Sequence, residues 1–471
     1  MTIKVNERQA NLILKAKCRQ DLGIFTQRAF STVDPGADYL HNWHIDCIAE
    51  YLKACTNREI KRLIINIPPR YMKSISVTVA WPAWLLGRNP SERILAASYS
   101  QQLSTKHSLD CRRLIQSDWY NEVFPNVELA DDENQKTRFE TTERGHRIAV
   151  SVGGSATGEG GDILIVDDPH NPMQAASEVQ RETALDWFDQ TFTSRLNNKK
   201  NGVIVVVMQR LHSDDLTGHL LKKGGWEHLT LPAYAEKKQF IQIGNFKKER
   251  PVGDVLHAAR EDLKQLERIK IDLGSYAYSG QYQQSPVPSE GGIFKKEWFR
   301  RYSLIPETTK RIVQSWDTAV KATQLNDFSV CTTWAEFDNA YYLLDTFAQR
   351  LEYPDLKRQV ITMAAKWQPD TILIEDKASG QALLQDLKKE TKLPLIAIMP
   401  ISDKITRASN ISALVEAGRV LLPERANWLP DFELEVSSFP LSTHDDQVDS
   451  MTQFLNWAKD RRTNNLQIRR L

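Results

Sequence analysis

The sequence of 471 residues has few cysteines and no long apolar run. Its 5 cysteines are scattered without the paired spacing of zinc ligands, which excludes such a zinc site or a disulfide framework and fits a reducing compartment. No apolar run reaches the roughly 18 residues that a membrane span needs, and the N-terminal stretch MTIKVNERQANLILKAKCRQ is too charged for a signal peptide. We therefore expect a soluble intracellular protein with no membrane contact.

Net charge is also nearly absent, because 61 Lys and Arg residues face 60 Asp and Glu residues. A net charge of +1 excludes nucleic-acid binding through bulk charge, so any such contact must come from local patches. The apolar share of 41% and the charged share of 26% are those of globular proteins, which excludes global disorder. The length predicts two or three domains.

The first half of the chain has the pattern of an α/β domain. Short apolar runs bounded by turn or polar residues predict buried strands of a parallel sheet. They are Leu63–Ile67, Arg93–Ser98, Ile163–Val166 and Val203–Met208. The stretches Ser104–Gln116 and Ser177–Phe192 have helical periodicity. Strands that alternate with helices indicate an α/β fold.

A change of composition separates the second half. Gln281–Gly292 is rich in proline and glycine, which is typical of a linker. Beyond it, strands at Ile312–Trp316, Ser329–Trp334 and Ala340–Phe347 predict an antiparallel meander. A helix at Tyr353–Trp367, a strand at Thr371–Ile374, a further α/β pair and a helix at Asp446–Trp457 follow. We predict an α/β domain at 1–285, a linker at 286–305, a mixed-sheet domain at 306–460 and a basic tail at 461–471.

A candidate nucleotide-phosphate site follows the first strand. Lys73 and Ser74 stand at a strand-to-helix junction, where a lysine can reach phosphates and a hydroxyl can bind Mg²⁺. Ile67 and Met72 occupy the positions of the two signature glycines. Taken alone, a Lys-Ser pair that opens an ordinary helix explains this stretch better.

Two later strand ends strengthen the phosphate-site interpretation. Asp167 and Asp168 end the strand Ile163–Val166; Asp167 suits the Mg²⁺ shell, and Asp168 could orient or deprotonate the attacking water. The alternative is that Asp168 caps the next helix. Gln209 and Arg210 end another strand and could sense or stabilise phosphate charge, although a surface arginine is about as plausible there. Together these residues favour an ATPase.

Carboxylates also end strands in the second domain. Asp317 and Glu375 each follow an apolar run, and Asp445 and Asp449 share one face of the last predicted helix. Acids that converge from separate elements can hold two divalent ions for phosphodiester cleavage, and hard oxygen ligands favour Mg²⁺ or Mn²⁺. The alternative is that acids in the first turn only complement the helix dipole.

The motifs in their order resemble those of the large terminase subunits of tailed phages and prophages. They are IINIPPRYMKS, GGSATGEGGDILIVDDP, VVVMQRLHSDDLTGHL, WDTA, ILIEDKASGQAL and HDDQVD. The resemblance covers about residues 40 to 458. It implies an N-terminal P-loop ATPase of the additional-strand type, which drives double-stranded DNA into a procapsid, and a C-terminal RNase H-like nuclease, which cuts concatemeric DNA with two metal ions.

The resemblance also implies roles for particular residues. Lys73 and Ser74 would bind the phosphates and Mg²⁺ of ATP, with Arg70 as a further phosphate contact. Asp167 would be the Walker B acid, and Gln209 would stand at the coupling position. The nuclease ligands would be Asp317, Glu375 and Asp445, assisted by Asp446 or Asp449.

The implied partners are double-stranded DNA, the portal protein of the procapsid and a small terminase subunit. The family forms a ring, commonly a pentamer, on the portal vertex. It works in the host cytoplasm and is not part of the mature virion.

Three departures from the family pattern concern the ATPase half. The phosphate loop has no glycine, Asp168 replaces the usual glutamate, and Gln209 replaces the usual Ser or Thr. An alternative function is therefore a metal-dependent nuclease or strand-transfer enzyme with an inactive ATPase-like domain. A third is a DNA- or portal-binding scaffold in which both sites are vestigial.

Overall fold

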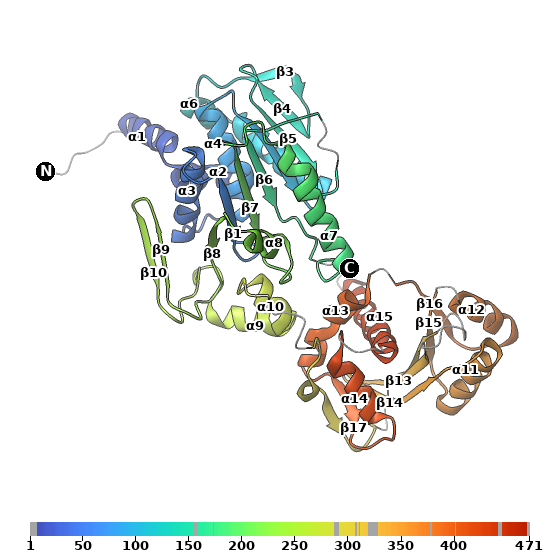
Figure 1. Ribbon diagram of the computed structural model, residues 1–471. Helices are drawn as coiled ribbons and strands as arrows, with labels where there is room; N and C mark the ends of the chain where they lie inside the picture. The colour runs from blue at the N-terminus through green and yellow to red at the C-terminus, as the bar shows by residue number, and fades with distance from the viewer. Residues whose placement is uncertain are drawn as a thin grey trace. The chain divides into compact units, whose positions relative to one another are not determined.

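The computed structural model describes residues 7–154, 158–172, 174–286, 292–306, 309, 311–318, 328–376, 379–400, 402–440 and 445–468. The chain divides into two compact units (Figure 1), which we call the N-terminal unit, Met1–Ile269 with Ala277–Val287, and the C-terminal unit, Lys270–Tyr276 with Pro288–Leu471. Among the described helices, none combines the length and the apolar character that crossing a membrane requires.

The N-terminal unit is built on an 8-stranded sheet in the order β3-β4-β5-β2-β6-β7-β1-β8. Its strands are β1 Arg62–Asn66, β2 Arg93–Ser98, β3 Leu129–Asn134, β4 Arg138–Thr141, β5 His146–Ser151, β6 Ile163–Asp167, β7 Val203–Met208 and β8 Glu227–Thr230. All pairs from β5 to β8 are parallel, and β3 and β4 add an antiparallel edge. The four strands predicted from apolar runs are therefore confirmed as neighbours β2-β6-β7-β1. A separate hairpin pairs β9 Gln239–Ile243 with β10 Phe246–Arg250.

Both faces of this sheet are covered, because its central strands are apolar on both sides. One face packs against helices from the N-terminal region and against the helices that follow β1 and β2, and the other face packs against helices that follow β6 and β7. The helices are α1 Glu7–Gln20, α2 Leu22–Val33, α3 Trp43–Thr56, α4 Trp81–Arg88, α5 Gln101–Ile115, α6 Asp118–Val123, α7 Glu178–Asp186, α8 Leu216–Lys223, α9 Leu263–Leu273 and α10 Ser275–Gln281. Shorter elements are the π-helices η1 Ile75–Ala80 and η2 Trp187–Phe192 and the 3₁₀-helix η3 Thr193–Arg195.

The C-terminal unit has a 7-stranded mixed sheet in the order β11-β17-β14-β13-β12-β15-β16. Its strands are β11 Arg300–Tyr302, β12 Arg311–Asp317, β13 Ser329–Phe337, β14 Ala340–Gln349, β15 Thr371–Glu375, β16 Leu395–Ile398 and β17 Val420–Pro423. The strands β12, β13 and β14 form the predicted antiparallel meander, and β15 adds to β12 in parallel. The mixed sheet predicted for the second half is confirmed.

Helices cover both faces of this second sheet as well. One face packs against α13 Lys404–Glu416, α14 Leu429–Ser438 and α15 Asp446–Ile468, and the other against α11 Tyr353–Trp367 and α12 Ser379–Glu390. The short 3₁₀-helix η5 Lys296–Trp298 precedes β11. The sequence predicts that the last helix ends at Trp457, but it continues to Ile468, because the chain there lacks proline and glycine and has helix-forming residues.

Candidate functional sites

The phosphate-loop candidate forms a sharp turn between β1 and the helical segment that begins at Lys73. Arg70 and Met72 have φ angles of 68° and 63°, in the left-handed region that favours glycine. Met72 stands where the family has glycine, so the loop adopts a glycine-like backbone without the residue. Lys73 and Ser74 then open the helix, as the sequence predicts.

Lys73, Asp167, Asp168 and Gln209 meet at the carboxyl edge of β1, β6 and β7. The buried ammonium of Lys73 lies 2.8 Å from Asp168 Oδ2, and Gln209 N donates to Asp168 Oδ1 over 3.3 Å. Asp168 itself has a φ of 47°. The next helix, α7, begins ten residues later at Glu178 with Ser177 as its cap, so Asp168 does not serve as a helix cap.

Asp167 is fully buried, and burial raises the pKa of its carboxyl group. Lys73, the hydroxyls of Thr78 and Ser74, and Arg147 lower that pKa in turn. Burial also raises the pKa of Asp168, against a lowering effect of Lys73. The buried Asp167 and the partly exposed Asp168 thus share Lys73 as a counter-charge.

Arg210 does not point into this site. Its Nε bonds both carboxylate oxygens of Asp215, at 3.0 and 2.9 Å, and its Nη2 donates to the carbonyls of His212 and Ser213. Asp215 has no exposed surface and caps α8. The predicted role of Arg210 toward phosphate is therefore not supported, because its guanidinium is committed to a buried ion pair.

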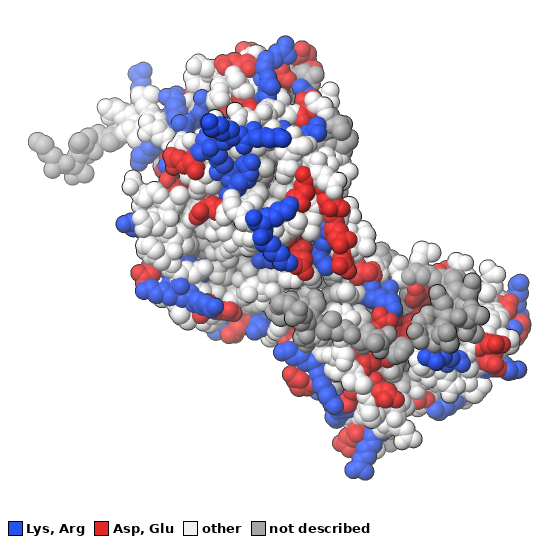
Figure 2. Space-filling view, viewed as in Figure 1, with Lys and Arg blue, Asp and Glu red and all other residues white. Residues whose placement is uncertain are grey.

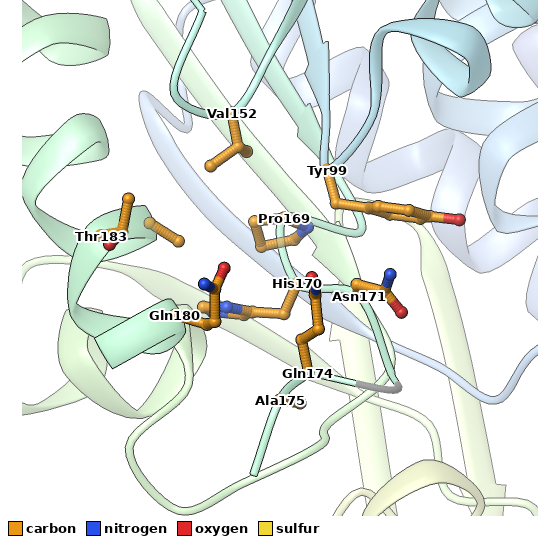
Figure 3. A pocket seen from close by; sticks show the side chains of 10 residues that line it. Tyr99, Val152, Pro169, His170, Asn171, Gln174, Ala175, Gln180 and Thr183 are labelled. Carbon is orange, nitrogen blue, oxygen red and sulfur yellow. The ribbon is translucent and has the colours of Figure 1, made fainter. Parts of the chain in front are cut away.

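A pocket lies beside these residues, at the carboxyl ends of β2, β5 and β6 (Figure 3). Its lining residues are Tyr99, Val152, Pro169, His170, Asn171, Gln174, Ala175, Gln180, Thr183 and Ala184. None of them is formally charged, and burial lowers the pKa of His170 to about 4, so this imidazole is neutral. His170 Nε2 accepts a hydrogen bond from Leu216 N. The pocket lining therefore carries no positive charge, unlike the Lys73 loop beside it.

In the C-terminal unit, Asp317 and Glu375 end the adjacent parallel strands β12 and β15. The pKa of Asp317 is well above its ordinary value, first because of burial and then because of Asp449, Glu375 and Asp446. The start of α15 is fixed to β12 by Ser450 Oγ, which donates to Ser315 O at 2.7 Å. The fold thus brings carboxylates of β15 and α15 close to Asp317 at the end of β12.

Two basic residues of α13 occupy part of this acidic cluster. Lys404 Nζ lies 2.6 Å from Asp445 Oδ1 and 2.7 Å from Asp449 Oδ2, and Arg407 Nη2 lies 2.7 Å from Asp449 Oδ1. Within the described parts of the chain, no three His, Cys, Asp or Glu side chains are arranged to hold one metal ion. The structure therefore joins Asp317 with Glu375, and it pairs Asp445 and Asp449 with side-chain cations.

Comparison with known proteins agrees with both halves of this architecture. Residues 314–457 match the family described as the terminase RNaseH-like domain. The large terminase of a thermophilic bacteriophage in complex with ADP matches with a TM-score of 0.53 at 9% identity, over 86% of this chain and 98% of that chain. The same terminase in complex with ATP-γ-S gives the same values, a TM-score of 0.53 at 9% identity over 86% and 98%. A comparison with curated proteins finds no match.

The resemblance to large terminase subunits is confirmed. Residues 314–457 match the terminase RNaseH-like domain, and the chain as a whole has the fold of the large terminases that it resembles.

Several residues of the two candidate sites carry no sequence signal that would reveal them. Thr78 and Arg147 lie close to Asp167 from the segments after β1 and within β5, and Lys404 and Arg407 come from α13. Glu435 accepts hydrogen bonds from the amides of Gln447 and Val448 at the start of α15. Thr78, Arg147, Lys404 and Arg407 come from elements remote in sequence from the acids they contact, so only the fold brings them together.

Proposed function

We propose that this chain is the large subunit of a phage or prophage DNA-packaging terminase. Its N-terminal unit couples ATP hydrolysis to the movement of double-stranded DNA into a procapsid, and its C-terminal unit cuts concatemeric DNA. The observation that carries the proposal is the match of residues 314–457 to the terminase RNaseH-like domain. In addition, the N-terminal unit of the chain places the buried Lys73 at a strand-to-helix turn.

The donor set of the N-terminal unit fits a magnesium nucleotide. Lys73 is a buried cation at a helix start, where amides and ammonium together attract phosphate. In the described part of the chain, Asp167 Oδ1 and Gln209 Oε1 are buried and make no hydrogen bond of ordinary geometry. Lys73, Ser74 and Arg70 would hold the phosphates, and Mg²⁺ would neutralise their charge. Asp167 would support the ion through Ser74, and Asp168 would orient the attacking water.

The acidic cluster of the C-terminal unit has the ligand chemistry of hard divalent cations, although no three ligands converge on one ion among the described residues. Carboxylate oxygens are the ligands that Mg²⁺ and Mn²⁺ prefer, and the crowding of Asp317 by other carboxylates calls for positive charge. Asp317, Glu375 and Asp445, with Asp449, would hold two Mg²⁺ or Mn²⁺ ions, which activate water and stabilise the leaving oxygen. Lys404 and Arg407 already supply positive charge to Asp445 and Asp449.

The proposed partners follow from the family. They are double-stranded DNA, the portal protein of the procapsid, a small terminase subunit and further copies of this chain in a ring, most simply a pentamer. We place the chain in the host cytoplasm and outside the mature virion. Side chains of both signs share the visible face of each unit (Figure 2), in line with the net charge of +1. A motor that must grip and release DNA is compatible with such a surface.

ATP hydrolysis by the purified full chain, with and without double-stranded DNA, tests the motor half of the proposal. We expect hydrolysis by the wild type and its loss in Lys73→Ala, with DNA cleavage retained by that variant. Cleavage without any ATP turnover in either protein would instead favour the nuclease or strand-transfer alternative, which the glycine-free loop motivates. Neither activity in the wild type would favour a scaffold.

A further inference from the structure

Behind the carboxylate of Asp167 lies a layer of buried polar side chains that the proposed phosphate chemistry does not use. Thr78 Oγ1 donates to Asp167 Oδ2 over 2.7 Å. Arg147 Nη2 in turn donates to the backbone carbonyl of Thr78 over 3.3 Å. His107 Nδ1 lies 3.6 Å from the same Oδ2, too far for a good hydrogen bond. The side chains of Asp167, Thr78 and Arg147 are all at most 1% exposed.

The local backbone explains why Thr78 reaches Asp167. Thr78 belongs to the π-helix η1, in which Trp81 N bonds to Ser76 O, five residues earlier. Such wider turns are rare and are frequently found at functional sites. Ser74 and Thr78 are four residues apart and both act on Asp167. The helix after the phosphate loop therefore presents two hydroxyls, rather than one, to the same carboxylate.

The burial of the Arg147 charge at this position is energetically unfavourable. Its guanidinium has no exposed surface, and its Nε and Nη1 make no hydrogen bond to any described residue. Asp167 and Asp110 are the carboxylates that face it. Burying an ion costs several kcal/mol, and apolar replacements of buried ion pairs are often neutral or stabilising. The hydrogen bond from Arg147 to the Thr78 carbonyl indicates a role for this buried charge, which is to fix the position of the Thr78 peptide group.

We propose that Thr78 and Arg147 are positioning residues for the Asp167 carboxylate. Arg147 holds the peptide group of Thr78, and the Thr78 hydroxyl holds Oδ2. The carboxylate would then be fixed in place to support, together with Ser74, the Mg²⁺ of a bound nucleotide. Lys73 would pair with the phosphates once nucleotide binds, whereas the fully buried Arg147 would remain as a counter-charge near Asp167. This inference rests on the proposed nucleotide site and adds to it residues that no phosphate-loop motif contains.

The test is a Mg²⁺ titration of the binding of a fluorescent ADP analogue to the full chain, together with binding of the same analogue in EDTA. We expect Thr78→Val to raise the Mg²⁺ concentration for half-maximal binding by about 10- to 100-fold, the usual cost of losing an outer-shell partner. Affinity in EDTA should stay within about twofold of wild type, because Lys73 and the loop remain. Thr78→Ser should bind like wild type, and Arg147→Met should shift in the same direction as Thr78→Val.

Ser76→Ala is the matched control, because Ser76 is buried on the same π-helix and its hydroxyl has no partner among the described residues. A Mg²⁺ requirement that is the same in Thr78→Val and wild type would overturn the inference. So would equal losses of affinity with Mg²⁺ and in EDTA, which would indicate general damage. If the wild type binds no ADP at all, the nucleotide site itself is wrong and this inference falls with it.

Discussion

Lys73 Nζ lies 2.8 Å from Asp168 Oδ2. This contact joins the residue expected to bind phosphate to the residue expected to handle the attacking water, across two strands that are not adjacent. In the nucleotide-free chain each therefore neutralises the other. Under the proposed function, ATP binding would transfer Lys73 from Asp168 to the phosphates and would free Asp168 to act on the attacking water.

Asp168→Asn separates these two roles. The amide keeps the shape of the side chain but can neither take a proton nor pair with Lys73 as an anion. We expect ATP hydrolysis to fall by about 100-fold or more, the usual contribution of a general base, whereas ADP affinity stays equal or becomes tighter. Steady-state hydrolysis and equilibrium binding measure the two effects. Weaker binding with unchanged turnover would assign Asp168 to nucleotide binding alone.

The left-handed backbone of the phosphate loop predicts a stabilising substitution. Arg70 is exposed and has a φ of 68°, a conformation that costs an L-residue about 1–2 kcal/mol. Arg70→Gly should raise the free energy of unfolding by about 0.5–1 kcal/mol after the entropy cost of glycine, as measured by urea denaturation. Arg70→Ala keeps the unfavourable φ and should bring no such gain. Equal stability of the two variants would show that the loop carries no strain at this residue.

Arg210 and Asp215 form a buried ion pair whose loss should be visible in stability. Arg210→Met leaves the Asp215 carboxylate without its partner, so we expect a loss of about 3–5 kcal/mol in the free energy of unfolding. Arg113→Met is the control, because Arg113 is 68% exposed and its pairing with Asp110 should be worth at most about 1 kcal/mol. If Arg210→Met is as stable as wild type but no longer hydrolyses ATP, that result would assign Arg210 to the phosphate site.

The acidic cluster predicts a pH dependence of stability in EDTA. Burial and the neighbouring carboxylates of Glu435 and Asp445 raise the pKa of Asp446 to about 6. Between about pH 4 and 6 the folded chain thus binds a proton that the unfolded chain has lost, so stability falls as pH rises through this window. Asp446→Asn should be more stable than wild type by about 1 kcal/mol at pH 7.5, a value discounted for partial exposure, and by less at pH 4. A pH-independent difference between the two would contradict the raised pKa.

Sequence alone predicts the features that are local along the chain. Apolar runs mark the strands β1, β2, β6 and β7, and the polar residues at the ends of these runs include Lys73, Asp167 and Asp168. Likewise Asp317 and Glu375 are identified because each ends an apolar run. Residues of this kind are accessible to sequence analysis because a buried strand tolerates charge only at its ends.

The residues that sequence analysis does not identify are brought together by packing between elements that are distant in sequence. Arg147 lies within β5, 69 residues from Thr78 in sequence, and Lys404 on α13 is 41 residues from Asp445. The left-handed φ of Met72 could not be predicted from the sequence either, because an unbranched side chain gives no sign of that conformation. The ion pair of Arg210 with Asp215 could not be predicted either, because it forms only in the folded chain.

Cleavage of supercoiled plasmid in Mn²⁺ by the full chain tests the central proposal most directly. We predict nicked and linear DNA with wild type and with Lys73→Ala, and uncut plasmid with Asp317→Asn or when EDTA replaces Mn²⁺. Cleavage by Asp317→Asn at the wild-type rate would contradict the assignment of the acidic cluster as the nuclease centre.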